Sequence, residues 1–159
     1  MKILYIHGLE SKPSEAKNEI FTQRGHQIWS PDMKFLDFAT TSEPYAILKN
    51  IATENEVDFL VGSSYGGFMA FWLGQELALP QLLFNPAVCG RGFEVPTSAE
   101  IRADVPSWVF LGALDDVIPA ELNLSFFADK PQARVVVAQY LGHRIDIQTM
   151  REAAGWAGL

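Results

Sequence analysis

Short apolar runs alternate with longer amphipathic stretches along the chain. A short, unbroken apolar run is typical of a strand that is buried on both faces, and such strands pair in parallel when helices connect them. The runs predict six strands, at 3–6, 26–29, 59–61, 81–84, 108–111 and 134–138. Strands in this order predict a three-layer α/β sandwich with an all-parallel, six-stranded sheet.

The stretches between the runs predict helices at 14–23, 42–55, 68–77, 119–129 and 145–156. Ser14 is a candidate N-cap for the first helix, Gly25 follows where that helix would stop, and Pro44 lies near the start of the second. The chain has 159 residues, and neither an internal repeat nor a linker divides it. A chain of this length fits one domain, so we expect a single domain over 1–159.

The chain is acidic, because 19 Asp and Glu residues against 12 Lys and Arg residues give a formal net charge of −7. A negative surface repels nucleic-acid phosphates and anionic lipid heads, and no apolar run is long enough to span a membrane. The N-terminus shows no signal-peptide cleavage pattern, and the lone Cys89 suits a reducing compartment. We therefore expect a cytoplasmic protein that binds neither nucleic acid nor membranes. The scattered His and Cys residues predict no metal, and we expect no cofactor.

The sequence Gly62-Ser63-Ser64-Tyr65-Gly66 follows the third predicted strand and precedes an apolar helix. A Ser at such a strand-to-helix turn adopts a strained backbone and projects its hydroxyl group from the sheet. The flanking positions must be small because strand and helix approach closely there, and Gly62 and Gly66 meet this need. In this context the pattern favours Ser64 as a nucleophile over a glycine-rich turn of a nucleotide-binding fold.

The loop after the first strand begins His7-Gly8-Leu9. A loop in this position can supply one backbone N–H group to an oxyanion hole, and the residue after the nucleophile supplies another. Leu9 and Tyr65 are therefore the expected oxyanion donors. We expect His7 to shape the loop rather than to act as a base.

An acid and a base have candidates on the loops that follow the last two strands. The fifth strand leads to Asp115 and Asp116, and either carboxylate could orient an imidazole or cap the following helix. The sixth strand is followed by His143, which completes the chain order Ser, Asp, His. His143 is therefore the expected general base, whereas the residues alone leave the choice between the two acids open.

Five segments of the chain resemble the small bacterial esterases of the YqiA type within the α/β-hydrolase superfamily. They are IHGLESKPSEAK at 6–17, VGSSYGGF at 61–68, LFNPAV at 83–88, the stretch 112–119 and the pair Gly142-His143. The combination is more specific than the turn at Ser64 alone. The resemblance implies a minimal α/β-hydrolase fold and an ester-cleaving activity.

The resemblance also selects one of the two acids. The acid loop of the superfamily often reads G-x-x-D with a Pro four residues after the Asp, and Gly112 and Pro119 place Asp115 in that register. By resemblance, Ser64, Asp115 and His143 would form the catalytic triad.

The segment from 86 to the acid loop is short beside relatives that carry a larger, lid-forming insertion there. We therefore expect little or no cap and a shallow, partly apolar substrate site. From loop position, the residues expected to line this site are Leu9, Tyr65, Phe93, Val117 and Ile118. The cations that could bind a carboxylate or phosphate of the substrate are Arg91, Arg102 and Arg144.

Together these features predict a serine hydrolase, a carboxylesterase or thioesterase, that cleaves small acyl esters through an acyl-enzyme intermediate. Two other hypotheses stay open. One is a binding protein of the same fold with little activity, since a fold does not fix a function. The other is an acyltransferase that uses the same triad. The apolar segment 86–96 and the tail 155–159 could support a homodimer.

Overall fold

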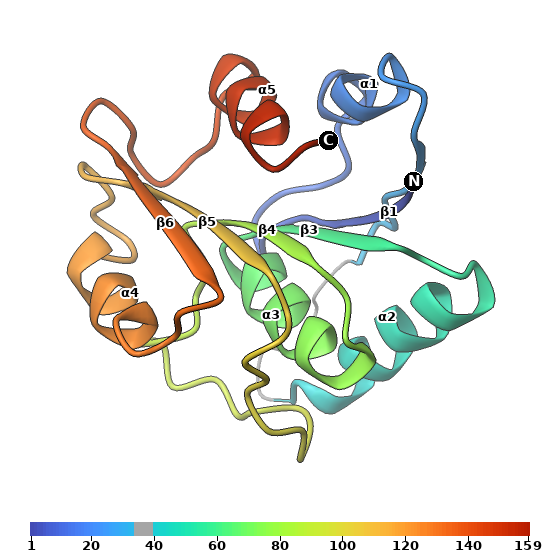
Figure 1. Cartoon of the computed structure of the whole chain (residues 1–159), viewed down its shortest axis with the longest axis horizontal. Helices are drawn as coiled ribbons and strands as arrows, with labels where there is room; N and C mark the ends of the chain where they lie inside the picture. The colour runs from blue at the N-terminus through green and yellow to red at the C-terminus, as the bar shows by residue number, and fades with distance from the viewer. Residues whose placement is uncertain (34–39) are drawn as a thin grey trace.

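The computed structural model describes residues 1–33 and 40–159. The described residues form one sheet with the strand order β2-β1-β3-β4-β5-β6, and every neighbouring pair of strands is parallel (Figure 1). The strands are β1 (Lys2–Ile6), β2 (Gln27–Trp29), β3 (Phe59–Ser63), β4 (Gln81–Phe84), β5 (Ser107–Gly112) and β6 (Ala133–Ala138). The helices are α1 (Glu15–Thr22), α2 (Ser42–Glu54), α3 (Tyr65–Leu77), α4 (Ala120–Phe127) and α5 (Ile147–Trp156). The predicted parallel α/β sandwich is confirmed.

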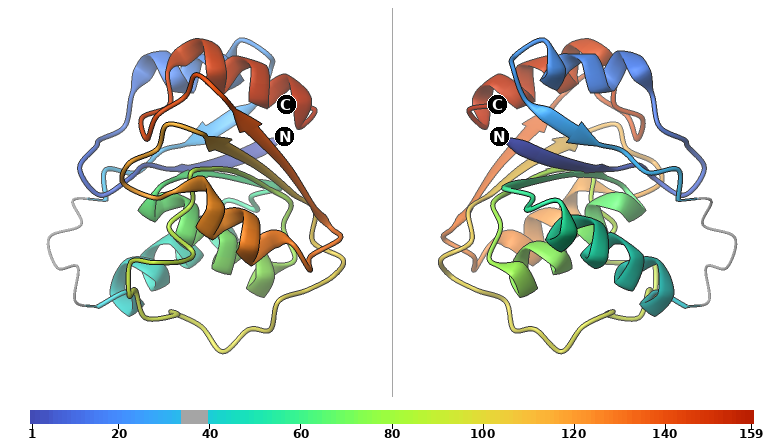
Figure 2. Two further views of the ribbon diagram at one scale, coloured as in Figure 1. Left: turned by 90° about the vertical axis from the view of Figure 1, so that its left-hand side faces the viewer. Right: turned by 90° about the vertical axis from the view of Figure 1, so that its right-hand side faces the viewer.

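Helices cover both faces of the sheet, α1 and α5 on one face and α2, α3 and α4 on the other (Figure 2). Successive strand residues point to opposite faces. Leu4 and Ile6 of β1 therefore pack with the second group of helices, whereas Ile3 and Tyr5 pack with the first. Burial on both faces explains why the strands appear as unbroken apolar runs. Within the described residues, no helix combines the length and the apolar character that a membrane span needs.

Two helix starts differ by more than one residue from those that the sequence predicts. Helix α3 begins at Tyr65, ahead of the expected start at 68, because the chain enters the helix directly from the turn at Ser64. Helix α5 begins only after Asp146, whose Oδ1 accepts a hydrogen bond of 2.8 Å from the N–H of Thr149 and so caps the helix. Ser14 occupies the N-cap position of α1, but its hydroxyl group makes no capping hydrogen bond.

The segment 86–106 connects β4 to β5 and contains neither helix nor strand, and the structure describes all of it. It runs along the outside of the layer formed by α2, α3 and α4, back to the amino end of β5 (Figure 2). Phe93 packs on Tyr65 with their ring centroids 4.8 Å apart, and Val105 is buried. The segment therefore covers the helical layer and forms no helical lid, in agreement with the expected small cap.

The turn from β3 into α3 has no room for a side chain at Gly62 or Gly66, the positions two residues before and after Ser64. A Cβ atom on Gly62 would overlap the carbonyl group of Gly66. A Cβ atom on Gly66 would overlap the carbonyl oxygens of Ile6 and His7. The start of α3 thus lies directly against the backbone of β1 and β3, which is the close approach that the glycine pattern predicts.

Substitution of Gly62 by Ala should destabilise the fold, because the new methyl group meets backbone atoms that cannot turn away. We expect Gly62→Ala to lower the free energy of unfolding by about 3 kcal/mol or more in urea denaturation. Gly155→Ala is the control: it lies in α5, its Cβ would be 3.9 Å from the nearest atom, and Ala favours a helix by up to about 1 kcal/mol. Equal stabilities of the two variants would contradict the close approach.

Candidate active site

Ser64 occupies the turn between β3 and α3 in a backbone conformation that residues other than glycine rarely adopt. Its φ is 55° and its ψ is −120°. Such a residue persists only when its surroundings hold it in place. The Ser64 N–H donates a hydrogen bond of 2.9 Å to the carbonyl oxygen of Phe84, and the Ser64 carbonyl oxygen accepts bonds of 3.0 Å each from the N–H groups of Phe68 and Ala87. The turn is therefore fixed from both β4 and α3.

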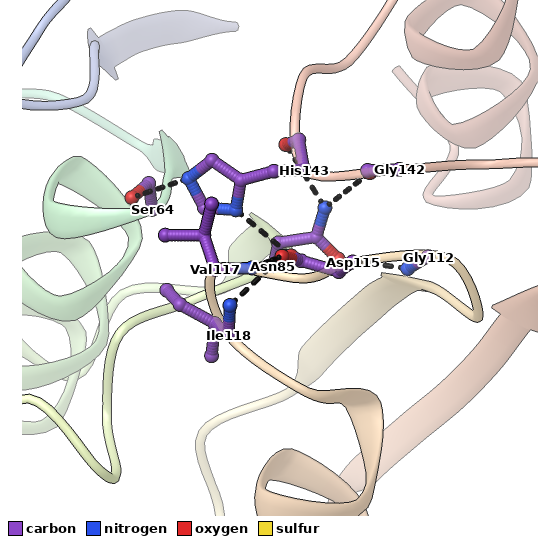
Figure 3. Close-up of polar contacts among 8 residues, drawn as sticks. All are labelled: Ser64, Asn85, Gly112, Asp115, Val117, Ile118, Gly142 and His143. Carbon is purple, nitrogen blue, oxygen red and sulfur yellow. Dashed lines mark hydrogen bonds and ion pairs between the residues drawn. The ribbon is translucent and has the colours of Figure 1, made fainter.

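His143 joins Ser64 to Asp115 through both of its ring nitrogens (Figure 3). Nε2 of His143 lies 3.1 Å from Oγ of Ser64, and Nδ1 lies 2.8 Å from Oδ2 of Asp115. A carboxylate only accepts, so Nδ1 carries the proton that it donates to Asp115. Nε2 is then an acceptor for the hydroxyl proton of Ser64. The structure thus brings together the three residues that the sequence selects for a triad.

Asp115 is held in place by the loop that it belongs to. Its side chain is fully buried, and Oδ1 accepts hydrogen bonds of 2.9 Å from the N–H of Val117 and 2.8 Å from the N–H of Ile118. Its other oxygen, Oδ2, is the partner of His143. Asp116 is exposed instead. The geometry therefore agrees with the choice of Asp115 from the register of the loop.

Asn85 ties the acid loop to the histidine loop, a contribution that the sequence reasoning missed. It directly follows β4 and is 2% exposed. Its Oδ1 accepts a hydrogen bond of 2.8 Å from the N–H of Gly112, and its Nδ2 donates bonds of 3.0 and 3.1 Å to the carbonyl oxygens of Gly142 and His143 (Figure 3). The sequence signal that could have pointed to Asn85 is the Asn-Pro pair at the end of a strand. Asn tolerates the left-handed backbone found there, where φ is 41°.

The loop after β1 is shaped by His7, as expected. His7 is 1% exposed, and its Nδ1 lies 2.7 Å from the carbonyl oxygen of Gly8. Its Nε2 accepts a hydrogen bond of 3.1 Å from the N–H of Met33. Both ring nitrogens are therefore engaged in backbone contacts, which favours a structural role.

A cavity of about 840 Å³ opens in front of Ser64. Its walls come from the loops after β1, β3, β5 and β6, with Lys17 added from α1 and Arg91 from the segment 86–106. The lining residues are Gly8, Leu9, Glu10, Ser11, Lys17, Ser63, Ser64, Arg91, Asp116, Val117, Gly142, His143, Arg144 and Ile145. Of the five residues expected to line a substrate site, Leu9 and Val117 do so. Among the described residues, no cluster of three or more His, Cys, Asp or Glu side chains is placed to hold a metal ion.

The other three residues expected at the substrate site do not line the cavity: Tyr65 and Ile118 lie in the core, and the half-buried Phe93 packs against it. Tyr65 is 1% exposed, and its ring packs against Phe68 and Phe93, with centroid distances of 5.9 and 4.8 Å. Burial raises the pKa of the Tyr65 hydroxyl to about 12. Ile118 is 2% exposed and belongs to the same hydrophobic cluster. Because the Tyr65 ring is buried among these neighbours, Tyr65 can offer the site only its backbone.

The chain belongs to the Uncharacterised protein family UPF0227, whose model matches residues 2–93. The match contains the turn at Ser64 and the loop after β1, and this is the YqiA-type family that the sequence resembles, so that prediction is confirmed.

Solved structures show the same fold over nearly the whole chain. A protein of Xanthomonas campestris described as a hydrolase of the alpha/beta superfamily is 24% identical, with a TM-score of 0.77 and coverage of 99% of this chain and 96% of that one. A monoacylglycerol lipase of Paleococcus ferrophilus is 14% identical, with a TM-score of 0.76 and coverage of 98% and 93%. An alpha/beta hydrolase from a lagoon-sediment metagenome is 17% identical, with a TM-score of 0.75 and coverage of 99% and 89%. The predicted α/β-hydrolase fold is therefore confirmed.

Replacing Asn85 by Asp should destabilise the protein even though the shape of the side chain barely changes. A carboxylate would place an oxygen against two carbonyl oxygens that now accept hydrogen bonds from Nδ2. We expect Asn85→Asp to lower the free energy of unfolding by about 3 kcal/mol or more, measured by urea denaturation.

The matched control is Asn50→Asp, an exposed position in α2 where the same change should cost less than about 0.5 kcal/mol. If Asn85→Asp proved as stable as this control, Asn85 would not be holding the two loops together.

Proposed function

We propose that the protein is a serine hydrolase, a carboxylesterase or thioesterase that cleaves small acyl esters with Ser64 as its nucleophile. His143 is the general base, and Asp115 orients it. The observation that carries the proposal is the continuous hydrogen-bond path from Ser64 Oγ through both nitrogens of His143 to the Asp115 carboxylate. Such a path activates a hydroxyl group that is otherwise a weak nucleophile.

In the first step, Ser64 Oγ forms a bond to the acyl carbonyl carbon while Nε2 of His143 takes the hydroxyl proton. The carbonyl oxygen becomes an oxyanion, which the backbone N–H groups of Leu9 and Tyr65 hold, each contributing about 3 kcal/mol of barrier lowering. The oxyanion then collapses, the bond to the alcohol or thiol breaks, and His143 passes its proton to the leaving group.

The position of each donor supports this role. The N–H of Leu9 donates no hydrogen bond to another described residue, and Leu9 lines the cavity beside Ser64. Tyr65 is the first residue of α3, and the amino end of a helix favours negative charge. These two observations support Leu9 and Tyr65 as the oxyanion donors.

In the second step, water replaces the leaving group. His143 takes a proton from water as its oxygen attacks the acyl carbon of the Ser64 ester. The bond between the acyl carbon and Oγ then breaks, and His143 returns the proton to Ser64. The products are a carboxylic acid and an alcohol or thiol. An amine is a poorer leaving group than either, so esters and thioesters are the preferred substrates.

Cys89 is a weaker candidate for the nucleophile. Burial raises the pKa of its thiol, which lowers the fraction of reactive thiolate. Cys89 also lies outside the residues that line the cavity at Ser64 and His143. Its chemistry is therefore not needed for the proposed reaction.

A fluorophosphonate probe tests the nucleophile directly, because it forms a covalent bond only with an activated serine. We expect the wild type and Cys89→Ala to be labelled, and Ser64→Ala to lose all labelling, with the probe followed by in-gel fluorescence. Circular dichroism should show that all three proteins are folded. Labelling that survives in Ser64→Ala, or folded wild type that resists the probe, would refute the assignment.

The acid is tested by a pair of adjacent substitutions. Asp115→Asn keeps the shape of the side chain but disturbs the tautomer of His143, so we expect kcat for para-nitrophenyl acetate to fall by about 10³–10⁴-fold. Asp116→Asn changes an exposed neighbour. Its reduction of kcat should be smaller than that of Asp115→Asn by a factor of about 100 or more. The reverse order of the two losses would assign the acid to Asp116.

A further inference from the structure

The charge at the cavity differs from that of the whole molecule. The chain carries a formal net charge of −7, yet its cavity is lined by the cations Lys17, Arg91 and Arg144. The acidic residues of the lining are Glu10 and Asp116, which are exposed like Arg91 and Arg144, whereas Lys17 is half-buried. Within the described lining, positive side chains therefore outnumber negative ones in an otherwise acidic protein.

Lys17 is half-buried in the first turn of α1 and has no acceptor among the described residues. By contrast, Lys49 and Lys130 each donate to an acceptor in the protein. Burial lowers the pKa of the Lys17 ammonium group, and the carboxylate of Asp146 offsets this effect in part. The Asp146 carboxylate itself accepts hydrogen bonds from the N–H and hydroxyl groups of Thr149. Lys17 thus lines the cavity with three N–H donors that have no hydrogen-bond acceptor among the described residues.

The three arginines that the sequence offers as anion binders differ in their surroundings. Arg102, which the sequence also allows as an anion binder, forms two hydrogen bonds of 3.0 and 2.8 Å with Asp104 and does not line the cavity. Arg144 directly follows His143, and neither Arg144 nor Arg91 has an acceptor among the described residues. Of these three arginines, the paired one therefore lies away from the cavity, and the two that line the cavity have no carboxylate partner among the described residues.

We infer that Lys17 and Arg144 form an anion site within the cavity, and that the substrate carries a carboxylate or phosphate group away from the carbonyl that reacts. This inference rests on the proposed ester-cleaving function and narrows its substrate class. An anion held there gains charge-assisted hydrogen bonds and offsets the cost of a half-buried ammonium group. Arg91 lies at the same cavity and adds to its positive potential.

Two pairs of esters test the site and reveal which part of the substrate carries the charge. In the acyl pair, the para-nitrophenyl monoester of adipic acid is compared with para-nitrophenyl hexanoate, which has a methyl group in place of the carboxylate. In the leaving-group pair, para-acetoxybenzoate is compared with para-acetoxybenzamide. We expect wild type to prefer the anionic ester in one pair by about tenfold or more in kcat/KM.

Variants then connect this preference to the cations. Lys17→Gln should reduce the ratio of kcat/KM for the anionic ester to that for its neutral partner by about tenfold, and Arg144→Gln should also reduce it. The matched control is Lys12→Gln, which removes an exposed lysine that does not line the cavity and should leave the ratio unchanged. The inference is overturned if neither pair shows a preference, or if the preference survives in both cavity variants.

A binding measurement separates this inference from the proposed function. Calorimetry with adipate and the Ser64→Ala variant requires no catalysis. Binding that Lys17→Gln abolishes in the same background would support the anion site even if no ester were hydrolysed, in which case only the esterase proposal would fail. If adipate did not bind and the charged and neutral esters were hydrolysed equally well, the anion site would be refuted. The esterase proposal would still be supported.

Discussion

The site depends on one close contact, the start of α3 against the backbone of β1 and β3 at Gly66. A Cβ atom there would overlap two carbonyl oxygens, so the helix can approach this far only with glycine. The same turn is tied to the end of β4, because Ser64 donates to Phe84 and accepts from Ala87. These bonds stabilise the left-handed backbone of Ser64, which would otherwise cost about 1–3 kcal/mol. Packing at a glycine therefore determines where the hydroxyl group lies.

The remaining groups reach the hydroxyl because parallel strands end at the same edge of the sheet. The acid follows β5 and the histidine follows β6, so the two loops start side by side. Asn85, at the end of β4, then hydrogen-bonds to backbone groups of both loops. This buried carboxamide explains how two irregular segments keep the His143 ring between Asp115 and Ser64. The loops supply the chemistry, and the sheet and Asn85 supply the geometry.

The sequence predicts the parts of this arrangement that follow from patterning and chain order. Apolar runs predict the strands of the sheet. Each residue of the proposed triad lies in the turn or loop that follows one of these strands. Asn85 was missed because its hydrogen bonds link segments that are far apart in the chain. The direction of a side chain could not be predicted from the sequence pattern either, because a residue next to the site can still point away from it. This explains why Tyr65 and Ile118 lie in the core and why Phe93 packs against Tyr65, although all three were expected to line the site.

The central claim is that Ser64 carries the acyl group during turnover. It is tested most directly by mixing the protein with para-nitrophenyl acetate, quenching with acid within milliseconds, and locating the acetyl group by peptide mass spectrometry. We expect one acetyl group on Ser64, which disappears when the substrate is exhausted. Ester turnover with no acetyl on Ser64, or with acetyl on another residue that forms and decays at the rate of turnover, would contradict it.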